Sequence, residues 1–229
     1  MPPPREQAAA ALAATDVSGT LAWLREHPSI KAPLHRPRGT TSTGFTALDE
    51  LLDGGLPTGA ITELVAGVGA ASAGRTSLAV GAVSAATRRG ELVAWVDTDD
   101  SLDPRGLAAA GVVLDQVLWI RPSGRDARKQ ALQAADLVVS AGGFGLLVLD
   151  LVGAGASRVP EATWVRFAHR LGAGRTAFVV LASDGFAGTQ AHLRLACRQR
   201  RGEVEVAVTK RRGGSPSGGA RVRLAVPVD

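Results

Sequence analysis

Disulfides, membrane spans and a signal-peptide core are all missing from this chain of 229 residues. Its single cysteine, Cys197, excludes an internal disulfide and indicates a reducing compartment, so we expect a cytoplasmic protein. No apolar run approaches the roughly 20 residues that a membrane-spanning helix needs, and no apolar signal core follows the N-terminal prolines. We expect Cys197 to be a small, partly buried filler and not a nucleophile.

Metal-ligand spacing and internal repeats are absent as well. The four histidines show no metal spacing, so we predict no metal site; they are His27, His35, His169 and His192. Hydrophobic residues make up 45% of the chain, which indicates a globular protein and excludes a disordered one. The length suits one α/β domain with a large core.

Positive charge gathers in residues 194–229, which hold nine lysines and arginines against three acids, while the whole chain carries a net charge of +5. Such a region on a nearly neutral body indicates nucleic acid or an acidic partner. A solvated arginine surface is the alternative. The candidate residues for binding DNA or a partner are Arg194, Arg198, Arg200, Arg201, Lys210, Arg211 and Arg212.

Four tryptophans could stack on bases of single-stranded DNA. Trp95 and Trp119 stand inside apolar strands, so we expect both in the core. Trp23 lies near the N-terminus, where it could anchor a partner protein. No motif that reads a DNA groove is visible, so we expect no sequence-specific binding.

Two regions differ in composition. Residues 5–26 have helical apolar spacing, and prolines and glycines among basic residues make 28–43 a linker. We therefore predict an N-terminal helical arm and linker over 1–38 and a core domain over 39–229. The arm could dock on its own body, on a second copy or on another protein.

The core alternates apolar strands with helices, which predicts an α/β fold with a mostly parallel twisted sheet covered by helices on both faces. Two alternating segments near the end predict a C-terminal antiparallel extension. Strands are expected at 61–65, 92–97, 117–120, 145–150, 177–182, 203–209 and 220–226, with helices around 45–52 and at 75–88, 125–140 and 160–171.

A glycine-rich loop joins the first of these strands to the second helix. It reads Gly69-Ala70-Ala71-Ser72-Ala73-Gly74-Arg75-Thr76, the phosphate-binding pattern G-x-x-x-x-G-K-[ST] with arginine in place of lysine. Gly69 and Gly74 would let the backbone wrap phosphates, and Thr76 would bind magnesium. The planar guanidinium of Arg75 keeps the charge but is bulkier than an ammonium group. The loop predicts nucleotide-binding ancestry with impaired chemistry.

Acids end two of the apolar strands. Asp150 stands where a phosphate-loop protein places the carboxylate that holds magnesium through water. Asp99, just after the strand at 92–97, stands where a water-activating carboxylate would be. The alternative is that both aspartates cap strand ends in loops.

Four blocks in this order resemble the RecA family over about residues 40–226. They are Ser42 to Asp49 with Gly54-Gly55-Leu56-Pro57-Thr58-Gly59, the acidic turn from Val96 to Pro104, the strand Leu147-Val148-Leu149-Asp150, and Val208-Thr209-Lys210-Arg211-Arg212. The resemblance implies a RecA-like core with an ATP and magnesium site at Gly69, Gly74, Arg75, Thr76, Asp99 and Asp150. It also implies that the basic motif at 208–212 reaches nucleotide on a neighbouring subunit.

Departures from the family pattern suggest a degenerate site. Arg75 replaces the lysine, Asp99 replaces a glutamate, and Ser183 falls where a glutamine senses the terminal phosphate. The two DNA-binding loops are short, at about 153–159 and 184–189. Together these changes predict a decayed ATPase in which Asp99 is vestigial, ATP and magnesium bind weakly at most, and the protein is not an enzyme.

A short RecA-like chain with a degenerate phosphate loop and a basic tail resembles the ImuA family, accessory proteins of the bacterial DNA-damage-induced (SOS) mutagenesis cassette. That resemblance implies a role in translesion synthesis with three protein partners: ImuB, RecA and an error-prone replicative-type DNA polymerase. Single-stranded DNA is a further candidate partner, and the oligomeric state is open.

Two alternative functions are kept. The chain could be a weakly active DNA-dependent ATPase of the recombinase type, using Gly69, Gly74, Thr76, Asp99 and Asp150. It could also be an inhibitor of RecA filaments or of cell division, like SulA, which has a reduced RecA-like body. ATP turnover separates the first alternative from an adaptor, and co-purification separates the second.

Overall fold

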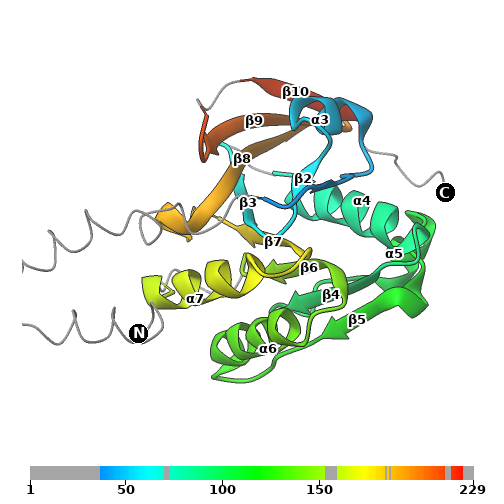
Figure 1. Ribbon diagram of the computed structural model, residues 1–229. Coiled ribbons are helices and arrows are strands. Elements are labelled where there is room, and N and C mark those ends of the chain that lie inside the picture. Colours follow the sequence, from blue (N-terminus) through cyan, green and yellow to red (C-terminus); the bar gives the residue numbers. More distant parts are fainter. Residues whose placement is uncertain are drawn as a thin grey trace, which may run out of the picture. The chain divides into compact units, whose positions relative to one another are not determined.

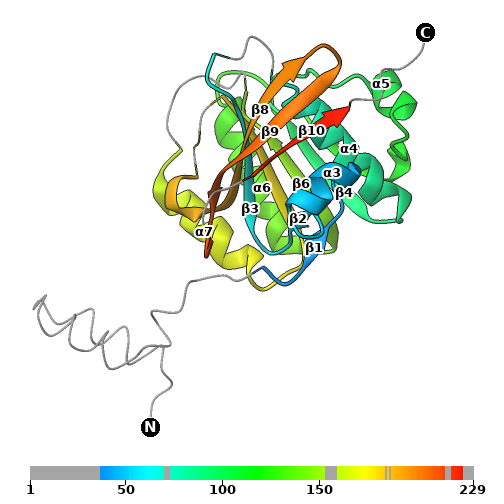
Figure 2. The same cartoon turned by 90° about the horizontal axis from the view of Figure 1, so that it is seen from above.

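The computed structural model describes residues 37–69, 73–152, 159–183, 185, 187–214 and 218–223. An eight-stranded sheet forms its centre, in the order β10-β9-β8-β3-β7-β6-β4-β5 (Figures 1 and 2). The strands are β3 (Ile61–Ala66), β4 (Leu92–Asp97), β5 (Val117–Ile120), β6 (Phe144–Asp150), β7 (Ala177–Ala182), β8 (Ala191–Arg200), β9 (Glu203–Arg211) and β10 (Gly219–Arg223). A second, two-stranded sheet pairs β1 (Thr40–Thr41) with β2 (Leu56–Pro57).

The predicted fold class is confirmed. Strands β8, β3, β7, β6, β4 and β5 run parallel, and β9 and β10 continue the sheet in antiparallel fashion. The strand β8 was missing from the sequence prediction. Its alternating residues Ala191, Leu193, Leu195 and Cys197 are buried, so it joins the parallel part of the sheet to the predicted antiparallel pair.

Helices cover both faces of the sheet, α4 (Arg75–Arg88) and α5 (Pro104–Ala109) on one side and α6 (Ala127–Ala141) and α7 (Glu161–Leu171) on the other (Figure 1). The core under α4 contains Trp95, which is fully buried as expected. The core under α6 and α7 contains Trp164, Phe167 and Phe178 in edge-to-face contacts, with ring centroids 5.8 and 5.4 Å apart. Trp119 is only half-buried because β5 is the edge strand.

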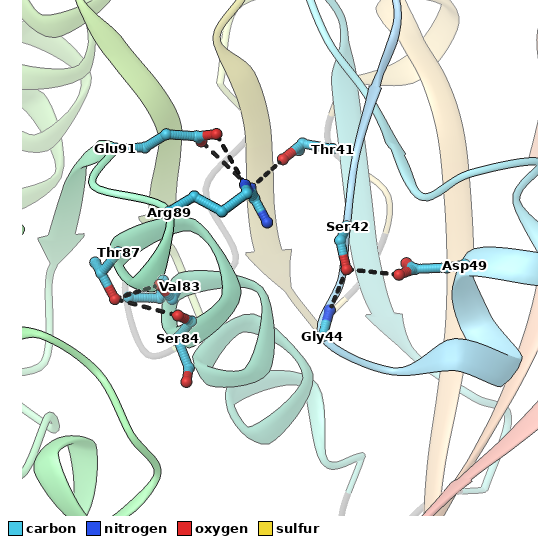
Figure 3. Close-up of polar contacts among 9 residues, drawn as sticks. All are labelled: Thr41, Ser42, Gly44, Asp49, Val83, Ser84, Thr87, Arg89 and Glu91. Atoms are coloured by element: carbon cyan, nitrogen blue, oxygen red, sulfur yellow. Dashed lines mark hydrogen bonds and ion pairs between the residues drawn. The ribbon is translucent and has the colours of Figure 1, made fainter.

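A short helix, α3 (Thr46–Leu51), precedes β3 and is fixed by Asp49. The Asp49 carboxylate accepts a hydrogen bond from Ser42 Oγ at 2.6 Å (Figure 3). It also accepts hydrogen bonds from Thr43 N and Thr43 Oγ1, both at 2.7 Å. The ring of Phe45 lies on Gly81 of α4, where an added Cβ would stand 2.3 Å from the ring. This part of the family signature therefore anchors the segment before β3 to the main helix.

The parts of the chain that the model describes contain no helix long and apolar enough to cross a bilayer. The predicted arm over 1–38 falls almost wholly outside the described residues, as do its Trp23, residues 153–158 of the first short loop, and residues 224–226 of the last predicted strand.

Candidate functional site

The carboxyl ends of β3, β7, β6 and β4 meet at one edge of the sheet, which we call the carboxyl edge. The chain passes from β3 through α4 to β4, and β7 and β6 lie between these two strands. Ligands of α/β proteins bind at the carboxyl ends of the parallel strands, at such a point. The glycine-rich loop and the predicted acids all lie along this edge.

The two glycines that flank the phosphate loop have left-handed backbone conformations. Gly69 and Gly74 have φ angles of +68° and +65°, and Gly74 is the N-cap of α4. An added Cβ at Gly74 would stand 2.4 Å from Val204 of β9, so only glycine fits there. Thr76 is exposed on the first helical turn. Residues 70–72 of the loop lie outside the described part of the chain.

Arg75, which replaces the lysine, begins α4 and is half-buried. Its Nη1 donates a hydrogen bond to the backbone carbonyl of Ala182, the last residue of β7. The guanidinium thus joins the start of α4 to the end of the neighbouring strand. One of its donors is used inside the protein at the position where the family pattern has the phosphate-binding cation.

A second arginine holds the loop from the other side. Arg198, on β8, donates from Nη2 to the carbonyl of Val68, while the Val68 side chain is 93% exposed. Arg198 is half-buried. The sequence assigned Arg198 to DNA or partner binding, and the structure places it on the backbone beside the phosphate loop.

Two aspartates occupy matching positions on adjacent strands, since Asp97 of β4 is in register with Asp150 of β6. Asp97 is fully buried. Its carboxylate accepts four hydrogen bonds, from Leu102 N at 3.1 Å and from Asp99 N, Ser101 Oγ and Trp119 Nε1, each at 3.3 Å. Asp97 therefore organises the acidic turn, a role that the sequence analysis did not assign.

Asp150 is also buried, at 3% exposure. Burial, together with the nearby Asp97 and Asp99 carboxylates, raises the pKa of Asp150 to about 6. The hydrogen bond from Val152 N (3.0 Å) and the charge of Arg75 oppose this rise. Asp99 itself is exposed. The structure thus brings the charges of Asp99 and Arg75 near Asp150.

These residues fit ATP and magnesium only in part. Thr76 and Asp150 supply oxygen atoms of the kind that magnesium prefers, and the glycines give the loop its required bends. The cation does not fit, because Arg75 is bonded to Ala182 and its donors are fixed in a planar fork. Ser183 replaces the expected phosphate sensor, is exposed, and donates weakly to the Val152 carbonyl at 3.5 Å.

Several of the predicted basic residues are bonded inside the protein. Arg194 pairs with the fully buried Glu63 of β3, with 2.8 Å between Nε and Oε2. Lys210 and Arg212 donate to the carbonyls of Gly188 and Thr189. These three cations therefore fasten the segment around residues 187–190 to the sheet.

The remaining members of that set divide between two ends of the sheet. Arg211 pairs with Asp53 at 2.7 Å and donates to the Leu51 carbonyl at 2.9 Å, which ties β9 to the segment after α3. Arg200 and Arg201 lie exposed at the β8–β9 turn, near the phosphate loop, and Arg200 is 3.9 Å from Glu205. Of the seven predicted residues, these two offer their charge most openly to solvent.

Other candidates have structural roles. Cys197 was expected to be partly buried but is fully buried. Burial raises the pKa of its thiol to about 12, so Cys197 is no nucleophile. The burial of Trp95 and Trp164 removes them from base stacking. No group of three or more potential metal ligands exists within the described ranges.

Comparison with known proteins identifies the family. The family model for the RecA N-terminal domain matches residues 35–164. The protein RecA of Latilactobacillus sakei is 39% identical over 124 residues, which cover 54% of this chain and 32% of that protein. RecA of Kineococcus radiotolerans is 36% identical over 167 residues, covering 71% and 44% respectively. The chain thus spans about a third to under half of the curated relatives it matches. It belongs to the family of the RecA N-terminal domain.

Proposed function

We propose that this protein is a RecA-like accessory protein of the ImuA type, an adaptor in damage-induced translesion synthesis with little or no ATPase activity. One observation carries the proposal: the cation of the phosphate loop, Arg75, donates to the Ala182 carbonyl. In a phosphate-loop enzyme this cation neutralises the terminal phosphates. An arginine bonded to the neighbouring strand has part of its donor set used there, which restricts how it can reach a phosphate.

The surroundings of Arg75 support the same proposal. Arg198 is bonded to the loop carbonyl of Val68, and Asp97 has four internal donors. Asp99, the candidate for activating water, is exposed and one methylene shorter than glutamate. A carboxylate in open solvent is poorly positioned for an attacking water molecule. Several polar groups at this edge are therefore bonded to the protein itself and not arranged around a ligand.

The partners belong to the proposal as well. A RecA-like body without turnover can still present the surfaces of its fold to other proteins. We propose ImuB, an error-prone replicative-type DNA polymerase and RecA as its partners, with single-stranded DNA at the exposed Arg200 and Arg201. A DNA-dependent ATPase is the second candidate function, favoured by exposed Thr76 and by Asp150 in register with Asp97.

Magnesium-dependent ATP hydrolysis of the purified protein, with and without single-stranded DNA, tests the proposal. We expect no turnover above a blank. The Arg75→Lys variant should show whether the loop lost activity through this residue alone, and Arg105→Lys on α5 is the matched exposed control. DNA-stimulated turnover that Asp150→Asn abolishes would overturn the adaptor proposal in favour of the ATPase.

Co-purification tests the partner assignment independently of nucleotide chemistry. The full chain should co-purify with ImuB when both are expressed together, in buffer without nucleotide. The same experiment with a cell-division protein should give no complex. A complex with the division protein and none with ImuB would support the SulA-like inhibitor instead and contradict the adaptor role.

A further inference from the structure

We infer that an open groove at the amino ends of the parallel strands binds an acidic peptide segment that carries an apolar side chain. This groove lies at the opposite end of the strands from the phosphate loop and encloses about 1000 Å³. Residues next to β1, the end of α4, the ends of α6 and α7 and the starts of β4 and β6 line it. The inference goes beyond the proposed function, since it holds whether or not the carboxyl edge binds nucleotide.

The groove is strongly cationic. Four arginines line it, Arg38, Arg89, Arg170 and Arg175, against a single acid, Glu91. Arginine presents a planar fork of donors that matches a carboxylate with two parallel hydrogen bonds. A set of arginines around one opening therefore favours a ligand with several carboxylates.

Two of the arginines are held in position by the protein. Arg89 donates to Glu91 from Nε at 3.0 Å and to Thr41 Oγ1 from Nη2 at 2.6 Å, so it bridges the end of α4 and β1 (Figure 3). Arg170 pairs with Asp136 at 2.7 Å and donates to Ser140 Oγ at 2.6 Å. A cation fixed in this way loses little conformational entropy when a ligand binds.

The other two arginines keep donors for a ligand. Arg175 is exposed and has no side-chain partner among the described residues. Arg38 uses Nε on the carbonyl of Gly172 at 2.9 Å, and its Nη atoms have no partner in that same part of the chain. The groove thus combines anchored cations with available ones, in contrast to the arginines at the phosphate loop.

The apolar side chains in the groove favour a peptide over a nucleic acid as its ligand. Leu92, at the start of β4, is 47% exposed in the wall of the groove, beside Val139 and the partly buried Phe144. A site for single-stranded nucleic acid offers exposed aromatic rings for stacking, and the one aromatic residue that lines this groove, Phe144, is partly buried. Arginines beside aliphatic surface suit carboxylates alternating with leucine-like side chains.

The charge of the chain's own remaining segments favours another protein as the occupant. Residues 1–36 carry four lysines and arginines against three acids, and residues 224–229 carry one acid, Asp229. Neither segment complements a groove of four arginines. An acidic segment of a partner protein does so, by the same electrostatic argument that governs protein interfaces.

Binding of two labelled synthetic peptides to the full-length protein tests the inference. The first is a capped 12-residue peptide in which glutamates alternate with leucines; the second has glutamine in place of each glutamate. Fluorescence anisotropy should detect only the acidic peptide. The double variant Arg38→Ala/Arg175→Ala should weaken that binding at least about tenfold, as expected for losing two charge-assisted contacts, and Leu92→Ser should weaken it less.

Controls separate this groove from the rest of the basic surface. Arg105→Ala, which removes an exposed arginine on α5, should leave peptide binding unchanged. Either of two results overturns the inference. The two peptides bind equally, or the acidic peptide binds the double variant with the same affinity as the wild-type protein. Loss of oligo-dT binding in the double variant, with no peptide binding, would show that the groove takes nucleic acid instead. None of these readouts depends on ATP or ImuB.

Discussion

The two edges of the parallel sheet carry similar residues and use them differently. At the carboxyl edge, Arg75 and Arg198 donate to backbone carbonyls and Asp97 accepts four hydrogen bonds. At the opposite edge, where the parallel strands begin and which we call the amino edge, Arg38 and Arg175 keep donors for a ligand around a groove. Arg75, Arg198 and Asp97 at the edge with the nucleotide-binding motif are thus bonded inside the fold, while two of the four arginines at the edge without a motif keep donors for a ligand.

A charged residue in a sequence can therefore have one of two roles, in stability or in ligand binding. A side chain whose donors are used inside the fold contributes mainly to stability, because removing it leaves buried partners unsatisfied. A side chain with exposed donors contributes little to stability and is available for a ligand. Substitutions at the carboxyl edge should therefore change mainly the free energy of unfolding, and substitutions at the amino edge should change mainly ligand binding. The predictions below test this difference.

Removal of the Asp97 carboxylate should have the largest effect. Asp97→Ala leaves four donors without their acceptor, two of them backbone N–H groups. Loss of such a buried network should lower the free energy of unfolding by about 3–5 kcal/mol. Urea denaturation measures this value. At the amino edge, Glu91→Ala removes an exposed ion pair and should cost less than about 1 kcal/mol; equal losses at the two edges would contradict the comparison.

Neutralising Asp150 should have the next largest effect on the free energy of unfolding, and it should raise that free energy where Asp97→Ala lowers it. The folded-state pKa of about 6 lies above the usual value of 3.8, so the folded protein becomes less stable as pH rises from about 4 through 6. Asp150→Asn removes this cost and should stabilise the protein by about 2–3 kcal/mol at pH 8. The advantage should shrink by roughly half at pH 5.

Urea unfolding of both proteins at pH 8 and pH 5 measures that change. Asp136→Asn, which alters a partly exposed acid on α6, is the control and should give no such stabilisation at pH 8. A constant difference between Asp150→Asn and the unchanged protein at both pH values would mean that charge burial is not the cause.

Much of the fold follows from the sequence because buried parallel strands are continuous apolar runs. The strands β3, β4, β5, β6 and β7 and the helix α4 lie where the pattern predicts them. The strand β8 was missed, although its buried residues alternate along the chain, because its arginines were interpreted as a basic binding region. Alternation of arginine with apolar residues is itself a strand signal.

The candidate site was predicted less completely, since the sequence shows residues and not their partners. The acidic turn was assigned to the family pattern, yet it also contains a helix start: Asp103 accepts from Arg105 N and Gly106 N, and Pro104 follows at the first helical position. The contact of Arg75 with Ala182 joins residues far apart in the chain. No local pattern could have predicted it.

Truncation of Arg75 should have a smaller effect than either aspartate substitution. Arg75→Ala removes a charge-assisted hydrogen bond to the Ala182 carbonyl and one opposite charge near Asp150. We expect a loss of about 1–2 kcal/mol in the free energy of unfolding, measured by urea denaturation at pH 7. Arg75→Lys should recover part of this loss. An unchanged stability in Arg75→Ala would mean that the side chain is available to a phosphate after all.

Truncation of Arg175 should have the smallest effect on stability. The side chain is exposed and has no partner in the described part of the chain, so Arg175→Ala should change the free energy of unfolding by no more than about 0.5 kcal/mol. Arg89→Ala, which loses contacts to Glu91 and Thr41, should cost slightly more. Both values come from the same urea denaturation series. A loss at Arg175 as large as that at Arg75 would show that the amino edge, too, uses its arginines to hold the fold.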